Sequence, residues 1–168
     1  NYKDWVVYFV DDGSTDGTGD WLKEMQRDDV HYIKGDGNLW WTGAVFVGIK
    51  QALARCSKGD YIMTLNNDLI FYDNDSLFSL VNAINLDPKS ICGSISVSDS
   101  GSGVVLSSGS KIICWFLNIT HHPFVGRIYS EIEKNAFVEV DMLTGRSVIY
   151  PASVFNSHGF DYINFPHY

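Results

Sequence analysis

Apolar runs and amphipathic segments alternate along the chain up to residue 90. Three runs are short and rich in β-branched and aromatic residues, which is typical of strands in a parallel sheet. They are residues 5–10, 30–34 and 61–65. The first run is continuously apolar and is therefore predicted to be buried on both faces. Because a helical pattern follows each run, the order of elements predicts a doubly wound α/β sheet.

The predicted helices are located by their apolar spacing and by the residues at their ends. The first passes through Trp21, Leu22 and Met25, with Ser14, Thr15 and Asp16 as candidate caps. The second begins at Thr42 and has one apolar face, formed by Val45, Ile49, Ala52, Leu53 and Cys56. The third has Asp75 as its N-cap, ends before Pro88, and has an apolar face formed by Leu77, Leu80, Val81 and Ile84.

The pattern after residue 90 is less regular. Strands are predicted at residues 91–97, 104–107, 112–116, 137–142 and 147–150. A short helix is predicted to begin at Pro151 and to stop at Gly159. The sequence thus predicts a single domain, residues 1–168, with a nucleotide-fold-like half (1–90) and a more irregular half (91–168).

Composition narrows the class of protein. The chain has 168 residues, 45% of them hydrophobic, and can bury a core without disulfides. Its formal net charge of −8 disfavours nucleic-acid partners, because phosphate contacts need a basic face. The same charge disfavours anionic membranes, except through a small local patch. The three cysteines lack C-x-x-C spacing and are predicted to be reduced thiols of a cytoplasmic protein.

Polar clusters follow the first and third predicted strands. Asp11 and Asp12 come directly after the first strand, and residues 66–68, Asn-Asn-Asp, follow the third. Ligands of open parallel sheets bind outside the carboxyl ends of the strands. Gly13 lets the backbone turn sharply beside the first cluster. We therefore expect the two clusters to border one ligand site.

Two other side chains, Trp41 and Arg146, could contact a ligand. Trp41 is predicted to stack on a sugar or a base, whereas Trp40 is predicted to be buried. Arg146 is interpreted either as a bidentate phosphate ligand or as a residue that ends a strand.

Residues 10–18, Val-Asp-Asp-Gly-Ser-Thr-Asp-Gly-Thr, resemble the signature of family 2 glycosyltransferases of the GT-A fold. Further segments resemble other stretches of the family in the same order; they are residues 38–48, 61–71, 143–146, 159–161 and 165–168. The last three resemble the acceptor-side region of bacterial rhamnosyltransferase-like members. The resemblance implies a Rossmann-like, mostly parallel sheet flanked by helices, with a more irregular, mixed C-terminal half.

The resemblance implies an inverting glycosyltransferase that moves a sugar from a UDP- or dTDP-linked donor to an acceptor hydroxyl. The acceptor would be a saccharide or a lipid-linked saccharide, in bacterial surface polysaccharide synthesis. The enzyme would work in the cytoplasm, at the inner face of the membrane. Two alternatives remain open: a sugar nucleotidyltransferase, and a non-catalytic nucleotide- or carbohydrate-binding module of the same fold.

The resemblance also implies roles for individual residues. The implied nucleotide-binding residues are Asp11, Asp12, Gly13, Ser14, Asp36 and Trp41. Asp68 would ligate Mg²⁺ or Mn²⁺; because Asn66 and Asn67 stand where many members carry acids, metal affinity without nucleotide is expected to be weak. The acceptor-side residues would be Gly145, Arg146 and His167.

Two further parts of the family's site are expected outside the sequence. A strand that flanks the base should precede Asn1, and the acidic general base should follow Tyr168, so that the domain is expected to be truncated at both ends. An inverting transferase needs this base to deprotonate the acceptor hydroxyl. No convincing substitute occurs in the sequence: Asp161 is better explained as a turn residue, and no further feature supports Asp141, which precedes the Thr144-Gly145 loop.

Overall fold

The computed structural model describes the chain except residues 1, 134–136, 157–163 and 165–168. The chain divides into two compact units, which we describe separately. Unit 1 comprises Asn1–Ile62 and Pro151–Tyr168, and unit 2 comprises Met63–Tyr150. No helix among the described residues is long and apolar enough to cross a membrane.

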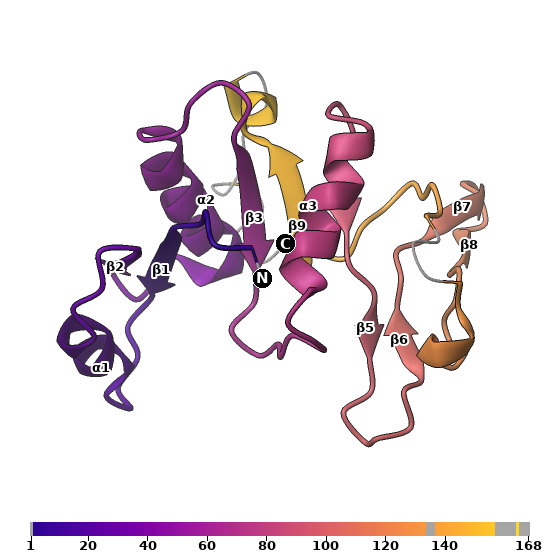
Figure 1. Ribbon diagram of the computed structural model, residues 1–168, viewed down its shortest axis with the longest axis horizontal. Coiled ribbons are helices and arrows are strands. Elements are labelled where there is room, and N and C mark those ends of the chain that lie inside the picture. Colours follow the sequence, from indigo (N-terminus) through magenta and orange to yellow (C-terminus); the bar gives the residue numbers. More distant parts are fainter. Residues whose placement is uncertain (1, 134–136, 157–163, 165–168) are drawn as a thin grey trace. The chain divides into compact units, whose positions relative to one another are not determined.

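Unit 1 begins with a strand, a helix and a second strand. Strand β1 (Val7–Asp11) pairs in parallel with β2 (Val30–Lys34), in a register that runs from Val7 opposite Val30 to Asp11 opposite Lys34. Helix α1 (Thr18–Glu24) connects the two strands (Figure 1). The parallel pair and its connecting helix confirm the first part of the predicted order.

The prediction that the first strand is buried on both faces is wrong. Val6 and Val7 are 52% and 39% exposed, Tyr8 to Val10 are half-buried, and only Asp11 is buried. Among the described residues β1 has one paired neighbour, β2. A continuous apolar run reflects side-chain composition, and it does not fix how many strands or helices cover the strand.

Helix α2 (Trp40–Leu53) supplies much of the core of unit 1. Its Ile49 is buried with Ile62 and with Ala152, which begins a short 3₁₀ helix (Ala152–Asn156). The other residues packed against this cluster are Val45, Ala52, Leu53, Cys56 and Phe155. All five residues of the predicted apolar face therefore contribute, as their helical spacing requires. A methyl group at Gly48 would approach Val10 to 3.3 Å, so the helix lies close to β1.

Helix ends differ from the prediction in detail. Of the three candidate caps of α1, the Asp16 carboxylate accepts hydrogen bonds from the Thr18 amide at 3.0 Å and the Thr18 hydroxyl at 2.7 Å. Ser14 instead donates to Asp11. Asp75 occupies the N-cap position of α3 (Ser76–Leu86), but its side chain makes no capping bond there.

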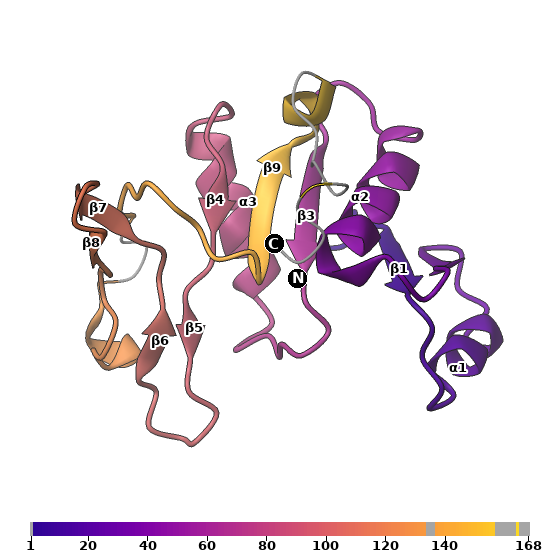
Figure 2. The same ribbon diagram turned by 180° about the vertical axis from the view of Figure 1, so that it is seen from behind.

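Unit 2 contains most of a three-stranded sheet with the order β3-β9-β4 (Figure 2). The strands are β3 (Tyr61–Leu65), β9 (Ser147–Pro151) and β4 (Cys92–Gly93). β4 and β9 are antiparallel. Helix α3 buries Leu80, Val81 and Ile84, which confirms most of its predicted face.

The rest of unit 2 consists of short antiparallel pairs. β5 (Ser96–Val97) pairs with β6 (Val105–Ser107), and β7 (Lys111–Cys114) pairs with β8 (Ile119–His121). A 3₁₀ helix spans Tyr129–Glu131. The predicted strand at 91–97 is two short strands, and the predicted strand at 137–142 is, in its described residues, a single bridge from Met142 to Ser110. β8 was not predicted, because a strand of three residues has too little alternation to be recognised.

The α/β composition agrees with the predicted fold class, and the mostly parallel sheet is present only in part. β1 and β2 are parallel, whereas β4–β9, β5–β6 and β7–β8 are antiparallel. The antiparallel pairs all lie after residue 90 or involve strands from that region, where the sequence predicted a mixed and irregular arrangement.

Candidate functional site

Asp11, the last residue of β1, is held from two directions. It is 5% exposed. Its Oδ1 accepts a hydrogen bond from the Ser14 amide at 2.9 Å, and its Oδ2 accepts one from the Tyr32 hydroxyl at 3.0 Å. The Ser14 hydroxyl and amide, the Tyr32 hydroxyl and the charge of Lys34 together hold the pKa of Asp11 below its ordinary value, against the opposing effect of burial. Asp11 is therefore an ionised anchor for the turn that follows β1.

Asp12 binds the backbone of a loop far along the chain. Its Oδ1 accepts from the Gly37 amide at 2.8 Å, and its Oδ2 accepts from the amides of Leu39 at 2.8 Å and Trp40 at 3.1 Å. Leu39 is the N-cap residue of α2, and its apolar side chain cannot accept a hydrogen bond. The Asp12 carboxylate therefore takes the place of a capping side chain at this helix.

The loop that Asp12 binds approaches β1 so closely that one position requires glycine. A methyl group at Gly35 would lie 2.5 Å from Oδ1 of Asp12, 3.0 Å from its Cα and 2.9 Å from Cδ1 of Leu39. The Gly35 amide also donates to the Asp11 carbonyl at 2.8 Å. The turn after β1 and the loop after β2 are consequently packed against each other through their backbones.

The remaining residues of this loop are exposed. The Asp36 carboxylate accepts from the Asn38 amide at 2.8 Å, which closes a local turn. Trp41 is 36% exposed and Trp40 is 60% exposed. The prediction that Trp40 is buried is wrong. Trp40 precedes Ile49 by nine positions, which places the two roughly 180° apart around α2, so Trp40 lies away from the face that enters the core.

These contacts bring most of the predicted nucleotide-binding residues together in unit 1. Asp11 and Asp12 lie at the end of β1, and Gly13, which follows them, has a left-handed φ of 95°. Asp36 and Trp41 flank the segment whose amides Asp12 binds. A carboxylate has about four lone-pair sites, and Asp12 already accepts three bonds. Its main effect in this structure is therefore to fix the loop that carries the exposed indole rings.

The second polar cluster lies in unit 2. The Asn66 amide donates to the Arg146 carbonyl at 2.9 Å, so that the segment after β3 is joined to the segment before β9. The side chains of Asp68 and Arg146 are exposed, and Gly145 is half-buried. Unit 2 thus brings the predicted metal-binding segment beside two of the predicted acceptor-side residues.

The chemistry of this segment fits a hard divalent cation that is bound together with a phosphate ligand. No group of three or more His, Cys, Asp or Glu side chains that could hold a metal occurs among the described residues. Mg²⁺ is commonly held by only one or two carboxylates together with substrate phosphates. The exposed Asp68 carboxylate meets that requirement.

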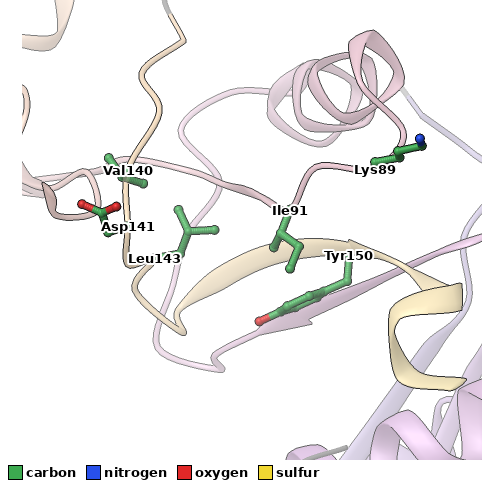
Figure 3. Close-up of a pocket in the computed structure, with 6 residues that line it drawn as sticks. All are labelled: Lys89, Ile91, Val140, Asp141, Leu143 and Tyr150. Atoms are coloured by element: carbon green, nitrogen blue, oxygen red, sulfur yellow. The ribbon is translucent and has the colours of Figure 1, made fainter. Parts of the chain in front are cut away.

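A pocket lies beside the acceptor-side segment of unit 2 (Figure 3). It is lined by Lys89, Ile91, Val140, Asp141, Leu143 and Tyr150. Burial raises the pKa of Tyr150, so its hydroxyl is protonated at neutral pH. The Asp141 carboxylate lines this pocket, and its Oδ2 accepts a hydrogen bond from the Ile112 amide at 2.8 Å, which joins it to β7.

Two of the predicted site residues cannot be compared with the structure, and two residues that contact the first cluster were not predicted. His167 and Asp161 are outside the described residues. Tyr32 and Gly35 were not singled out from the sequence, although both contact the first cluster. The parallel register gives a signal for Tyr32, since it lies opposite Phe9 and close to the end of β1. Gly35 has a weaker signal, a glycine at the carboxyl end of the second strand.

Residues 1–148 match the family described as Glycosyl transferase family 2. The match covers both polar clusters and the segment around Gly145 and Arg146. The chain shows no significant match to a curated protein or to a solved structure.

Proposed function

We propose an inverting sugar transfer for this chain because it belongs to glycosyl transferase family 2, whose match spans residues 1–148. The donor is a UDP- or dTDP-linked sugar, and the acceptor is the hydroxyl of a saccharide or of a lipid-linked saccharide. The reaction belongs to bacterial surface polysaccharide synthesis. Membership of this family favours the transferase over a sugar nucleotidyltransferase.

The observation that carries the proposal is the set of bonds around Asp12. Its carboxylate joins the end of β1 to the loop that begins α2, through the amides of Gly37, Leu39 and Trp40. Such a loop is fixed before a ligand arrives, which lowers the entropy cost of binding. The exposed rings of Trp40 and Trp41 supply surfaces on which a base can stack. We assign this rim to the nucleoside part of the donor.

We assign the diphosphate to the segment that carries Asp68. When bound there, Mg²⁺ or Mn²⁺ supplies the neutralisation of charge on the leaving nucleoside diphosphate. Asp68 is the carboxylate that would hold the ion, and the exposed Arg146 guanidinium is suited to a phosphate. The acceptor is assigned to the side of Gly145 and Arg146.

The acceptor also bears on where the enzyme works. A lipid-linked acceptor is confined to a membrane, and a nucleotide-sugar donor is a water-soluble metabolite. We propose that the protein works in the cytoplasm, at the inner face of the membrane, where the two meet.

Titration calorimetry with UDP and with dTDP, each with and without Mn²⁺, tests the nucleotide and metal assignments. Asp12→Asn is expected to lower nucleotide affinity about tenfold, because the loop loses a charged acceptor. Asp68→Asn is expected to remove the part of the affinity that depends on Mn²⁺. The matched control is Asp99→Asn, an exposed acid on the turn between β5 and β6.

Circular dichroism of each variant separates loss of binding from loss of folding. Unchanged nucleotide affinity in folded Asp12→Asn and Asp68→Asn proteins would contradict the site assignment. If the full-length protein, with the segment in which the general base is expected, binds the nucleotide but neither hydrolyses nor transfers the sugar of a matching donor, the non-catalytic module is the better description.

A further inference from the structure

The tip of the β7–β8 hairpin exposes three consecutive large apolar side chains. Trp115, Phe116 and Leu117 are 76%, 98% and 70% exposed. Ile113 and Ile119, which flank them on the two strands, are 65% and 47% exposed. Isolated apolar residues on a surface need no explanation, but a contiguous group of this kind marks an interaction site.

The hairpin that presents these side chains is held in place at both ends. Its strands pair from Lys111 opposite His121 to Cys114 opposite Ile119 (Figure 1). At the tip, the Asn118 amide donates to the Trp115 carbonyl at 3.3 Å, and Asn118 has a φ of 50°. At the base, Asp141 accepts from the Ile112 amide. The apolar tip is therefore displayed on an ordered turn within unit 2.

The segment that contains the hairpin has a formal charge opposite to that of the whole chain. Residues 100–130 contain no Asp or Glu, and they form the longest acid-free stretch of a chain that has 20 acidic residues. The charged residues in this stretch are Lys111 and Arg127, and both are exposed. His121 and His122 are exposed as well. Lys111 and Arg127 thus give the segment 100–130 a formal charge of +2 on a chain with a net charge of −8, and the acid that contacts the hairpin from outside this segment is Asp141, at the Ile112 amide.

We propose that this hairpin tip inserts into the interface of an anionic phospholipid bilayer. A tryptophan beside purely apolar side chains suits the boundary between headgroups and acyl chains. Nearby basic residues are attracted to the negative surface of such a membrane.

The inference rests on the membrane part of the proposed function and gives it a structural element. Insertion brings unit 2, which carries the predicted acceptor-side residues, to the surface where a lipid-linked acceptor resides. The binding itself needs neither nucleotide nor metal. Vesicle binding and nucleotide binding can therefore fail independently, and measuring each without the other ligand distinguishes the two failures.

Co-sedimentation of the full chain with vesicles tests the proposal. Wild-type protein is expected to bind phosphatidylcholine vesicles that contain phosphatidylglycerol, and to bind pure phosphatidylcholine vesicles much more weakly. The double variant Trp115→Ser, Phe116→Ser is expected to lower the partition coefficient roughly tenfold or more. Its matched control is Trp21→Ser, Phe78→Ser, which removes a Trp and a Phe that are 59% and 47% exposed elsewhere.

Two further measurements identify the inserted group and the role of charge. Dibrominated lipids are expected to quench the tryptophan fluorescence of the wild-type protein, and to quench it less in Trp115→Phe, which keeps four of the five tryptophans. Lys111→Glu combined with Arg127→Glu is expected to abolish the preference for phosphatidylglycerol.

Failure of the wild-type protein to bind the anionic vesicles, or equal binding by the tip variant, would overturn the proposal. Analytical ultracentrifugation without vesicles tests a second copy of this chain as the occupant. If the wild-type protein is a dimer that the tip variant converts to a monomer, with vesicle binding unchanged, the tip is a protein interface and the proposal is wrong.

Discussion

Asp12 accepts hydrogen bonds from amides that lie 25 to 28 residues further along the chain. A carboxylate at a helix N-terminus is favourable because it satisfies orphan amides and complements the helix dipole. Here that carboxylate comes from the end of another strand, so the start of α2 depends on the turn after β1. The geometry of one side chain therefore connects the position of two exposed tryptophans to the end of β1.

Gly35 is the residue at which this arrangement is most sensitive to side-chain volume. We expect Gly35→Ala to lower the free energy of unfolding by about 1–3 kcal/mol, because the added methyl group collides with the backbone and carboxylate of Asp12. We also expect it to weaken nucleotide binding by displacing the loop. Urea denaturation measures the first effect and calorimetry the second.

Gly37→Ala is the control for this prediction. Gly37 lies in the same loop with a φ of 87°, but nothing lies within 4 Å of an added methyl group. Its substitution introduces backbone strain of about 1 kcal/mol without a collision. If Gly35→Ala is as stable as the wild-type protein, the close approach of the two loops is not present in solution.

The position of Asp11 and Asp12 at the end of β1 could be predicted from the sequence, but the hydrogen bonds that each one makes could not. Asp11 and Asp12 stand out because acids at the end of a buried-looking strand are unusual. Sequence spacing contains no information about a bond between Asp12 and Trp40, since that bond depends on how two loops pack in space. Tyr32 was missed for the same reason, because a tyrosine in a strand is ordinarily a packing residue.

At the scale of the elements, helices were predictable because their apolar spacing is measured over several turns. The predicted faces of α2 and α3 contain all the apolar side chains that the structure buries in these helices, Ile49 in α2 and Leu80, Val81 and Ile84 in α3. Short strands were less predictable, because two or three residues carry almost no alternation. The tip of the β7–β8 hairpin was interpreted as part of a strand at 112–116, since exposed aromatic residues in a turn have the same composition as a buried strand.

Helix α3 offers a test of its predicted apolar face, because one side of the helix is buried and the other is exposed. Ile84 is completely buried, whereas Leu86, two residues later, is 74% exposed. We expect Ile84→Ala to lower the free energy of unfolding by about 2–5 kcal/mol, through lost burial and the cavity that remains. We expect Leu86→Ala to change it by less than about 0.5 kcal/mol.

Equilibrium denaturation in urea measures the free energy of unfolding of both variants. The ellipticity at 222 nm reports the helix content during the titration. Equal losses in the two variants would show that α3 does not pack through the face that carries Leu80, Val81 and Ile84. The comparison is internal to one helix, so differences in helix propensity contribute little to it.

At the scale of the whole molecule, charge and burial act together on stability. Among the described residues, three carboxylates of unit 1 have lowered pKa values: Asp11, Asp16 and Asp29. Hydrogen bonds to Ser14, to Thr18 and to Arg27, respectively, are the main causes. These groups favour the ionised form in the folded protein, and folding therefore becomes dependent on pH in the acidic range.

A carboxylate whose pKa is lower in the folded state stabilises the fold at pH values above its unfolded pKa, and this contribution is lost as the pH falls through the folded pKa. We therefore expect the contribution of these carboxylates to the free energy of unfolding to be constant at pH values above the ordinary Asp pKa of 3.8. Below that pH, we expect the free energy of unfolding to decrease. Asp11→Asn should flatten that decrease, since Asp11 is the buried member of the three. Urea denaturation at a series of pH values between neutral and strongly acidic measures the slope. An identical slope in Asp11→Asn and wild-type proteins would mean that the bonds from Ser14 and Tyr32 do not favour the ionised form of Asp11.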